Sequence, residues 1–392
     1  MALKSITEAD LKGKKVLARF DFNVPLKNGQ ISDSSRIDLA LPTIRFLLEQ
    51  GISKLTLMSH LGRPKGKVNP DLSLEPVADY LANQLNEEVI LTESAISNGV
   101  KELLTLKSTK IVLLENLRFH PEEEQNGNEF AKSLSDYGEI YVNDAFGAAH
   151  RKHASVYNIN KYFPNRAYAG LLLKAEIDSL NKILHSPKKP FMAIIGGAKI
   201  SDKIKTIEKL LVNVDKLFIG GAMAYPFLKA KGQSIGNSLC NEEDIKLAKN
   251  ILKADKGKKL VLPIDHMIVE KFGAKPITSK NTDIEEGYMG IDIGPKTIAH
   301  YQDLLKSAKT ILWNGPMGVF ENPDYAKGTM SLCETIAGLD AFSLVGGGDS
   351  VSAVNKSGLA QKFSHVSTGG GASLEYIEKG ELPGIQALKF GV

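Results

Sequence analysis

The sequence predicts an α/β protein of two domains, each a parallel β-sheet flanked by helices. Apolar runs of four to six residues alternate with longer stretches of helical periodicity along the whole chain, which is the pattern of βαβ units. The length of 392 residues exceeds that at which one hydrophobic core normally keeps growing, so two domains are expected. In addition, the strand-like runs end on charged or amide residues in the first half and on paired glycines in the second half.

The strand-like runs of the first half share basic, acidic or amide side chains at their carboxyl ends. They are VLARF before Asp21 and Asn23, LTLM before His60 and Arg63, IVLL before Arg118, and IYV before His150 and Arg151. The carboxyl ends of parallel strands lie along one edge of a sheet, where ligands bind. We therefore expect these side chains to form one wall of a binding site.

The basic members of this wall, together with Arg36, indicate an anionic ligand. An arginine fork matches a carboxylate or a phosphate. One such arginine alone is more typical of a solvated surface, whereas four at equivalent positions favour a ligand site. Asp21 and Asn23 lie two residues apart and are expected to point the same way. They suit hydrogen bonds to a substrate hydroxyl, although taken alone they are better explained by a turn before Pro25.

The strand-like runs of the second half end on glycines. They are FMAII before GGAK, LFI before GGA, FSLV before GGGDS, and HVS before TGGGA. Glycines let backbone N–H groups approach phosphate oxygens at a strand-to-helix turn. This half therefore indicates a phosphate-binding wall, and the glycines expected in it are Gly220, Gly347, Gly348, Gly369, Gly370 and Gly371.

Charged residues accompany these glycines. The segment IIGGAKISDKIK places Lys199 and Lys203 four residues apart, which we expect to put both in the opening turn of a helix, beside its positive end. In LVGGGDSVSAV, Asp349 is expected at a helix N-terminus, where a carboxylate either caps the helix or reaches a Mg²⁺ bound to phosphate. The segment WNGPMGVFE, from Trp313 to Glu321, is typical of a glycine-proline loop that carries one carboxylate.

Helical periodicity fills the stretches between these runs. Apolar residues recur at i, i+3 and i+4 in residues 41–51, 76–85, 201–211 and 242–254. Residues 168–190 predict one amphipathic helix closed by Ser-Pro-Lys-Lys-Pro. We place the hinge between the domains in this helix.

Composition excludes several classes of function. The 43% hydrophobic and 24% charged residues are ordinary for a globular enzyme, and a net charge of +4 suits a small anion but is too low for a nucleic-acid-binding protein. Cys240 and Cys333 lie in no CxxC or Cys/His cluster, so neither disulfides nor a zinc site are expected. The N-terminal segment MALKSITEADLKGKK lacks the apolar core of a signal peptide, and no apolar run approaches the length of a membrane span. We expect a cytoplasmic protein without nucleic-acid or membrane partners.

Familiar catalytic and phosphate signatures are missing from the sequence. It contains no G-x-x-x-x-G-K-S/T motif of P-loop enzymes and no HRD and DFG pair of protein kinases. No G-x-G-x-x-G opens a helix with an acidic residue about 20 residues later, which argues against a dinucleotide-binding dehydrogenase. The sequence also lacks a G-x-S-x-G elbow and a histidine close to either cysteine, so it does not indicate an enzyme with a serine or cysteine nucleophile.

Nine segments, in order and across nearly the whole chain, resemble phosphoglycerate kinase. They are FDFNVP, SHLGRP, LENLRFHPEEE, YVNDAFGAAHRKHAS, GGAKISDKI, DIGPKT, WNGPMGVFE, GGGDS and STGGGAS. So many motifs in register make the match very specific. The one departure is Ser350 after Asp349, where some family members have threonine; a hydroxyl is kept.

The resemblance implies two Rossmann-like domains joined by a hinge helix. It assigns residues 1–168 and 376–392 to a glycerate-binding domain, 169–184 to the interdomain helix and 185–375 to a nucleotide-binding domain. The C-terminal segment ELPGIQALKFGV is expected to return to the first domain. A monomer is the family expectation.

The resemblance also implies the reaction. A phosphoryl group passes reversibly from 1,3-bisphosphoglycerate to MgADP, giving 3-phosphoglycerate and MgATP, in glycolysis and gluconeogenesis. The implied cofactor is Mg²⁺, with ADP or ATP as co-substrate. Because a carboxylate is already the leaving group, no general base is needed; positioning, cations and exclusion of water by hinge closure are what the reaction requires.

Each predicted site residue has an implied role. His60, Arg63, Arg118 and Arg151 hold the phosphate that is not transferred, Asp21 and Asn23 contact the hydroxyl and carboxyl end of the glycerate, and Arg36 and Lys199 flank the transferring group as catalytic residues. The nucleotide-binding residues are Lys199, Lys203, Gly220, Asn314, Glu321, Gly347, Gly348, Asp349 and Ser350, with Gly369, Gly370 and Gly371 as a phosphate loop. Asp349 is the carboxylate on the metal side, and Glu321 binds the ribose.

Three alternatives are distinguishable. A dehydrogenase would show an NAD-dependent absorbance change, and a nucleic-acid-binding module would need a contiguous basic stripe with aromatic residues and a steep salt dependence. A phosphosugar-binding protein without catalysis would keep the arginine wall but have no use for Lys199, Lys203 and Asp349.

Overall fold

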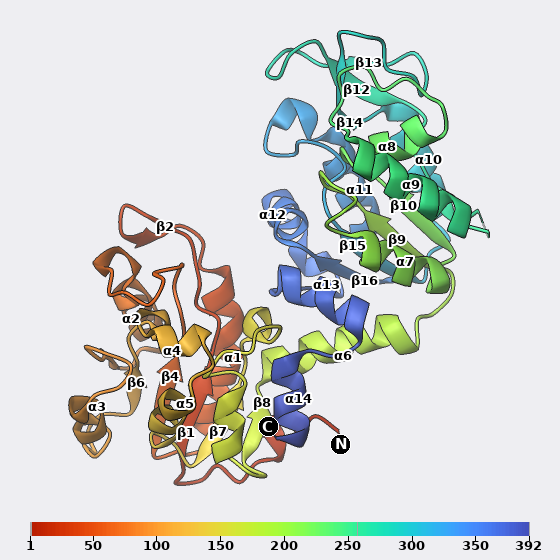
Figure 1. Cartoon of the computed structure of the whole chain (residues 1–392). Helices are drawn as coiled ribbons and strands as arrows, with labels where there is room; N and C mark the ends of the chain where they lie inside the picture. The colour runs from red at the N-terminus through yellow and green to blue at the C-terminus, as the bar shows by residue number, and fades with distance from the viewer. Residues whose placement is uncertain (1, 257, 392) are drawn as a thin grey trace. The chain divides into compact units, whose positions relative to one another are not determined.

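The computed structural model describes residues 2–256 and 258–391. Residues 1, 257 and 392 belong to the predicted domains but lie outside the described residues. The chain divides into two compact units, which the colours of Figure 1 allow the reader to follow. Unit 1 is Met1–Asp178 with Glu381–Val392, and unit 2 is Ser179–Gly380. The division falls inside helix α6, Leu171–His185.

Unit 1 is built on a six-stranded parallel sheet with the strand order β5-β6-β4-β1-β7-β8. The strands are β1 (Lys15–Arg19), β4 (Lys54–Met58), β5 (Val89–Leu91), β6 (Ile111–Leu113), β7 (Ile140–Asn143) and β8 (Ala167–Ala169). In the centre of the sheet, Leu17 of β1 pairs with Thr56 of β4 and Tyr141 of β7. Strand β4 is buried at every position, as expected for a parallel strand covered on both faces.

Helices flank this sheet, and a two-stranded hairpin, β2 (Leu26–Lys27) with β3 (Gln30–Ile31), precedes the first of them (Figure 1). The helices are α1 (Ser35–Glu49), α2 (Glu75–Leu85), α3 (Asn98–Leu103), α4 (Pro121–Glu124), α5 (Asn128–Ser135) and α14 (Pro383–Phe390). Helix α1 buries Ile37, Leu41 and Ile44, whose spacing places one apolar stripe against the core.

The C-terminal helix α14 packs within unit 1. The backbone N–H of Gly384 donates to the carbonyl of Ala149 at 2.9 Å. A Cβ at Gly384 would lie only 2.7 Å from Cγ1 of Val156, so a glycine is needed for this close approach. The end of the chain is thereby attached to the segment that follows β7.

Unit 2 contains a second six-stranded parallel sheet, with the order β11-β10-β9-β15-β16-β17. The strands are β9 (Phe191–Ile195), β10 (Lys216–Ile219), β11 (Leu260–Val261), β15 (Thr310–Asn314), β16 (Phe342–Gly346) and β17 (His365–Val366). The helices are α7 (Ile204–Asn213), α8 (Ala224–Ala230), α9 (Glu242–Ala254), α10 (Pro295–Leu305), α11 (Lys327–Ala337), α12 (Gly348–Ser357) and α13 (Gly370–Lys379).

A smaller antiparallel sheet in unit 2 was not anticipated from the sequence. Its order is β13-β12-β14, from strands Ile277–Thr278, His266–Val269 and Met289–Ile293. Its strands are short, and β14 begins at the half-buried Met289 and Gly290, so the sequence shows no long apolar run there.

The core of unit 2 surrounds Trp313 in the central strand β15. The indole is fully buried, and its Nε1–H donates to the carbonyl of Gly315 at 2.9 Å. The central strand is therefore fastened to the loop that follows it. Each helix in the described part of the chain is too short or too polar to span a lipid bilayer. The predicted fold class, an α/β protein with two parallel sheets flanked by helices, is confirmed.

Candidate active site

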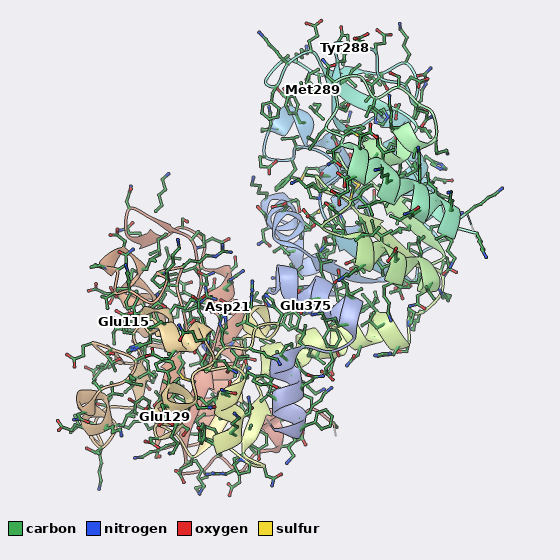
Figure 2. All side chains as sticks on the ribbon, in the orientation of Figure 1. Asp21, Glu115, Glu129, Tyr288, Met289 and Glu375 are labelled. Carbon is green, nitrogen blue, oxygen red and sulfur yellow. The ribbon has the colours of Figure 1, made fainter. Side chains whose placement is uncertain are left out.

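In unit 1, Asp21, Asn23 and Arg36 come together beyond the end of β1. The guanidinium NH1 of Arg36 lies 3.3 and 3.2 Å from the two carboxylate oxygens of Asp21, and it donates to the carbonyl of Asn23 at 3.2 Å. The backbone N–H of Asn23 also donates to Asp21 at 3.2 Å. Asp21 and Asn23 therefore form a turn that also holds Arg36, so the turn does not exclude a role for them in ligand binding. Figure 2 shows where Asp21 lies.

The loop after β4 joins the same region. Oδ1 of Asn23 accepts a hydrogen bond from the backbone N–H of Gly62 at 2.8 Å, and the carbonyl of Gly62 accepts one from NH1 of Arg118 at 2.9 Å. Arg63 is exposed on this loop, and its side chain makes no hydrogen bond or ion pair within residues 2–256 and 258–391. The structure thus brings Asn23, Arg63 and Arg118 into one neighbourhood.

Arg118 is largely buried among other positive groups. Its side chain is 12% exposed, and its Nε lies 3.5 Å from Glu124. Burial and the charge of Arg19 lower the pKa of Arg118. Because burial and neighbouring positive charge destabilise the charged guanidinium, a second anion such as a phosphate would stabilise it.

Arg19, the last residue of β1, was missed by the sequence analysis. Its side chain is fully buried, and its Nε donates to Oγ of Ser155 at 2.9 Å. Its NH2 lies 3.0 Å from Nδ1 of His60. Arginine is almost never fully buried without partners, so a basic residue at the end of an apolar strand was the signal that could have identified it.

His60 and a second missed residue, His153, lie in the same positive field. Burial, followed by the charges of Arg19 and Arg118, lowers the pKa of His60 well below its usual value. The pKa of His153 is lowered to about 3 by burial and then by Arg118, Arg19 and Arg151. His60, Arg118 and Arg151, which were predicted at separate strand ends, therefore share one positive field with Arg19 and His153. His153 lies only two residues beyond Arg151 in the segment RKHAS.

In unit 2, the predicted phosphate-binding residues line one cavity of about 220 Å³. Eight of its lining residues were predicted from the sequence: Lys203, Asn314, Gly347, Gly348, Asp349, Ser350, Gly370 and Gly371. Gly315 and Leu374 also line it and were not predicted. The cavity lies where the N-terminal turns of α12 and α13 meet the end of β15. Backbone N–H groups and the positive helix ends there favour phosphate.

Lys203 provides the cation of this cavity. Its Nζ donates to the carbonyl of Gly196 at 2.7 Å and lies 3.4 Å from the carbonyl of Asn314. Burial lowers the pKa of Lys203 to about 8, while the charges of Asp349 and Asp202 raise it. An ammonium that burial destabilises in this way is stabilised by a bound phosphate.

The prediction that Lys199 and Lys203 share the opening turn of a helix is wrong. Helix α7 begins only at Ile204; Lys203 is its N-cap, and Lys199 is exposed in the loop that follows β9. The glycine pair extends this loop, with Gly197 at a φ of +108°. That conformation is outside the helical range, and residues 201–203 form a turn before the helix, so the helix begins later than the charge pattern suggested.

Asp349 and Ser350 are neighbours in the first turn of α12, but their side chains differ in exposure. Asp349 is exposed and makes no helix-capping hydrogen bond, so its carboxylate remains free to face a ligand. Ser350 is fully buried, and its Oγ accepts a hydrogen bond from the N–H of Gly315 at 2.5 Å. Gly347 precedes this turn with a φ of +94°, and a Cβ there would lie 2.8 Å from Nδ2 of Asn314.

Besides Lys199, three predicted residues of unit 2 lie outside this cavity. A Cβ at Gly220 would meet Sδ of Met317 at 2.3 Å, so this glycine accommodates the loop after β15. Glu321 is exposed on that loop. Gly369 is the N-cap of α13, one residue before the cavity-lining Gly370.

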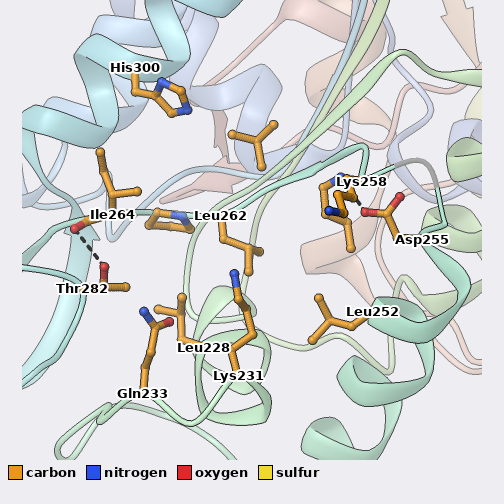
Figure 3. Close-up of a pocket in the computed structure, with 13 residues that line it drawn as sticks. Leu228, Lys231, Gln233, Leu252, Asp255, Lys258, Leu262, Ile264, Thr282 and His300 are labelled. Atoms are coloured by element: carbon orange, nitrogen blue, oxygen red, sulfur yellow. Dashed lines mark hydrogen bonds between the residues drawn. The ribbon is translucent and has the colours of Figure 1, made fainter.

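A larger cavity, of about 680 Å³, lies elsewhere in unit 2 (Figure 3). Leu228, Leu252, Leu262, Lys231 and His300 are among its lining residues, and it shares no lining residue with the smaller cavity. It contains none of the glycine turns that bring N–H groups to a phosphate. The smaller cavity therefore has the chemistry of a phosphate site, although the larger one has more volume.

Comparison with known proteins decides the family. A family model described as phosphoglycerate kinase matches residues 6–380. A phosphoglycerate kinase of Clostridium novyi is 48% identical over 392 residues, covering 98% of each chain. This chain belongs to the phosphoglycerate kinase family. A phosphoglycerate kinase of Clostridium botulinum (strain Hall) is 49% identical with the same coverage.

Solved phosphoglycerate kinases are also similar in structure. The protein from Coxiella burnetii has a TM-score of 0.88 at 39% identity, and the one from Pyrococcus horikoshii has a TM-score of 0.86 at 31% identity. Each comparison covers 99% of both chains. The chain is thus a member of the phosphoglycerate kinase family, which is a family of enzymes, and the resemblance noted from nine segments is confirmed.

Proposed function

We propose that this chain catalyses reversible phosphoryl transfer between 1,3-bisphosphoglycerate and MgADP, giving 3-phosphoglycerate and MgATP, as a step of glycolysis and, in reverse, of gluconeogenesis. Membership of the phosphoglycerate kinase family supports the reaction. The two sets of residues described above support it chemically, because one is suited to a phosphorylated acid and the other to a polyphosphate.

The cavity of unit 2 is the observation that carries the proposal. It combines a partly buried ammonium, Lys203, an exposed carboxylate, Asp349, and the glycine turns of two helix N-termini. A protein that only bound a phosphosugar would need the basic cluster of unit 1 but not this cavity. The combination favours a nucleotide with its metal ion over a second sugar phosphate.

In unit 1, the basic cluster would bind the glycerate. His60, Arg63, Arg118 and Arg151 would hold the phosphate that is not transferred, while Asp21 and Asn23 contact the hydroxyl and carboxyl end. The lowered pKa values of His60 and Arg118 support this assignment, because a phosphate dianion relieves the crowding of positive charge.

In unit 2, the nucleotide would bind along the glycine turns. Lys203, Asn314, Ser350 and the glycines Gly347, Gly348, Gly369, Gly370 and Gly371 would surround its phosphates. Gly220 would lie beside the base or sugar, and Glu321 would accept from the ribose hydroxyls. The position of Gly220 against Met317 supports a second role for it, in shaping this loop.

The residues of the cavity fit a magnesium ion that arrives with the nucleotide. Asp349 is the one carboxylate among the residues that line it. Mg²⁺ retains several waters and needs few protein ligands when phosphates also bind it. Asp349 would hold the ion on its protein side, and the bound ion would neutralise phosphate charge.

Arg36 and Lys199 would act on the phosphoryl group in transfer. Charge spreads over its equatorial oxygens during the reaction, and fixed cations stabilise that charge. The ion pair with Asp21 holds the guanidinium of Arg36 in place. No general base is required, since the glycerate carboxylate is the leaving group.

The domain roles form part of the proposal. Residues 1–168 with 376–392 would bind glycerate, 185–375 would bind nucleotide, and 169–184 would join them. Transfer requires the two bound substrates to meet, so hinge closure during turnover belongs to the proposal, and it would exclude water from the acyl phosphate.

The test is ATP formation from MgADP and enzymatically generated 1,3-bisphosphoglycerate, with a magnesium-free control. We expect ATP to form only when magnesium is present. A folded protein that binds both ligands without turnover would contradict the proposal and favour a phosphosugar-binding protein.

A further inference from the structure

A chain of buried polar groups lies beneath the basic cluster of unit 1. It begins at Glu123 in α4, passes through Ser155 and Arg19, and ends at His60, residues that lie far apart in the sequence. Three of the four are 0% exposed, and His60 is 4% exposed. Burying two charged side chains costs free energy unless hydrogen bonds satisfy them. In this series of groups both Glu123 and Arg19 have such hydrogen bonds.

The direction of each hydrogen bond in this chain is fixed by chemistry. Glu123 only accepts when ionised: one carboxylate oxygen lies 2.6 Å from Oγ of Ser155, and the other accepts the N–H of Ser155 at 2.9 Å. The single hydroxyl proton of Ser155 therefore points to Glu123. Oγ of Ser155 then accepts from Nε of Arg19 at 2.9 Å.

The contact with Arg19 determines which ring nitrogen of His60 carries the proton. An arginine can only donate, so the 3.0 Å contact between its NH2 and Nδ1 of His60 requires Nδ1 to accept. The proton of the neutral ring must then be on Nε2. His60 makes no Nε2 hydrogen bond within residues 2–256 and 258–391, so this N–H is available to a ligand.

We propose that Glu123 and Ser155 are positioning residues that act through Arg19 to hold His60 as a neutral Nε2–H donor for the phosphate of the glycerate. This inference rests on the proposed function for the identity of the ligand. Arg19 makes no direct ion pair with a carboxylate in the described part of the chain, and its charge is balanced through the hydroxyl of Ser155 instead. That arrangement leaves its NH2 free for the histidine.

A neutral donor suits this position for an electrostatic reason. Arg19, Arg118, His153 and Arg36 are the charged or titratable groups that act on His60, and all are basic. Burial and these groups lower the pKa of His60, so a charged imidazolium there would be costly. A fixed tautomer presents an N–H to the phosphate without proton uptake.

The test uses the full chain labelled with ¹⁵N-histidine, and His60→Gln assigns the signal of His60. We expect the imidazole nitrogen shifts of the wild type to show only the Nε2–H tautomer, without titration between about pH 5.5 and 8. The Nδ1–H tautomer, or a titration near pH 6.5, would overturn the proposal even if neither Ser155→Ala nor Glu123→Gln folds.

Ser155→Ala and Glu123→Gln test the positioning role. Each should give mixed tautomers at His60 and weaken 3-phosphoglycerate binding, measured by calorimetry, by about tenfold, the order that one hydrogen bond to a charged group contributes. The affinity for MgADP should stay within about twofold. The control is Thr56→Val, which removes from the same sheet a buried hydroxyl that has no hydrogen-bond partner among the described residues. It should change neither the tautomer nor the affinity.

Folded variants that keep the wild-type tautomer and affinity would overturn the proposal. So would altered tautomers with unchanged affinity, because His60 would then not serve the ligand. These readouts require no turnover, so they are independent of the ATP-formation test of the proposed function.

Discussion

The chemistry of single residues is clearest at Lys203, whose pKa of about 8 results mainly from burial. A bound diphosphate should raise this pKa again, since an anion stabilises the ammonium. Above pH 8, nucleotide binding must then take up a proton. The affinity should fall as the pH rises from 8 to 9.5, by up to about tenfold per pH unit.

Calorimetric titration with MgADP across pH 7 to 9.5 checks this sign. Lys203→Arg is the matched variant, because arginine stays charged throughout this range, and its affinity should vary far less with pH. A wild-type affinity that is constant from pH 7 to 9.5 would contradict the role of Lys203 as the cation of the cavity.

Arg36 and Lys199 allow a separate residue-scale prediction. If each stabilises charge on the transferring group, replacement by alanine should reduce kcat by roughly 10²- to 10³-fold. Steady-state rates at saturating substrates measure this effect. Lys246→Ala removes an exposed lysine from α9 and should leave kcat unchanged. A variant of Arg36 or Lys199 with wild-type kcat would remove that residue from the catalytic role.

Single residues could be predicted from the sequence where they lie beside a glycine turn or at the end of a predicted strand. Lys203, Asp349 and Asn314 were predicted and do line one cavity. Arg19 was missed because it lies inside the run VLARF and resembles part of a strand. Its importance depends on burial against Ser155 and His60, which are distant in sequence, and such tertiary contacts leave no local pattern.

Among the elements, strand β14 shows how a buried acid organises the loop after β15. Oδ2 of Asp292 accepts from the N–H of Gly328 at 2.6 Å, and Oδ1 accepts from the N–H of Ile293 at 2.9 Å. Burial raises the pKa of Asp292 to about 7. A Cβ at Gly318 would lie 2.4 Å from Oδ1 of Asp292, so the loop packs directly on this carboxyl group.

The raised pKa of Asp292 predicts a pH-dependent stability. The folded state keeps its proton up to about pH 7, whereas the unfolded state releases it near pH 4, so stability should fall as the pH rises between these values. The advantage of the wild type over Asp292→Asn in free energy of unfolding should decrease by about 3 kcal/mol from pH 5 to pH 8.

Urea unfolding followed by fluorescence measures this difference, because the single tryptophan, Trp313, lies in unit 2. Asp303→Asn is the control, since that carboxylate is 74% exposed. An advantage of the wild type that is constant or increases with pH would show that Asp292 is ionised in the folded protein.

The glycine turns make a second prediction for elements. Because a Cβ at Gly220 would meet Met317, Gly220→Ala should displace the loop after β15 and raise the KM for nucleotide several-fold, leaving the KM for glycerate unchanged. Gly338→Ala is the control; a Cβ there would have only ordinary contacts, at 3.6 Å. Equal KM values in wild type and Gly220→Ala would show that the loop does not shape the nucleotide site.

Element prediction from the sequence succeeded where hydrophobic patterns were long. The alternation of apolar runs and amphipathic stretches indicated both parallel sheets. It did not indicate the antiparallel strands β12, β13 and β14, which are short, nor the late start of α7 at Ile204. Residues 201–203 form a turn before that start, and a charge pattern carries no information on where such a turn ends.

For the whole molecule, the proposed function places glycerate binding in unit 1 and nucleotide binding in unit 2. Arg63→Ala and Arg118→Ala in unit 1 should raise the KM for glycerate by about tenfold or more, the order of one lost hydrogen bond to a charged group, with little change in the KM for nucleotide. Steady-state kinetics with each substrate varied in turn measure both values. An equal rise in both would contradict the division.

Hydrogen exchange of the full chain with one ligand at a time tests this division of ligand binding between the units. Saturating 3-phosphoglycerate should slow amide exchange near residues 21–23, 60–63, 118 and 151 of unit 1. MgADP should slow it near residues 196–203, 314–321, 347–350 and 369–371 of unit 2. Protection of the same unit by both ligands, or protection by neither in folded protein, would contradict this division.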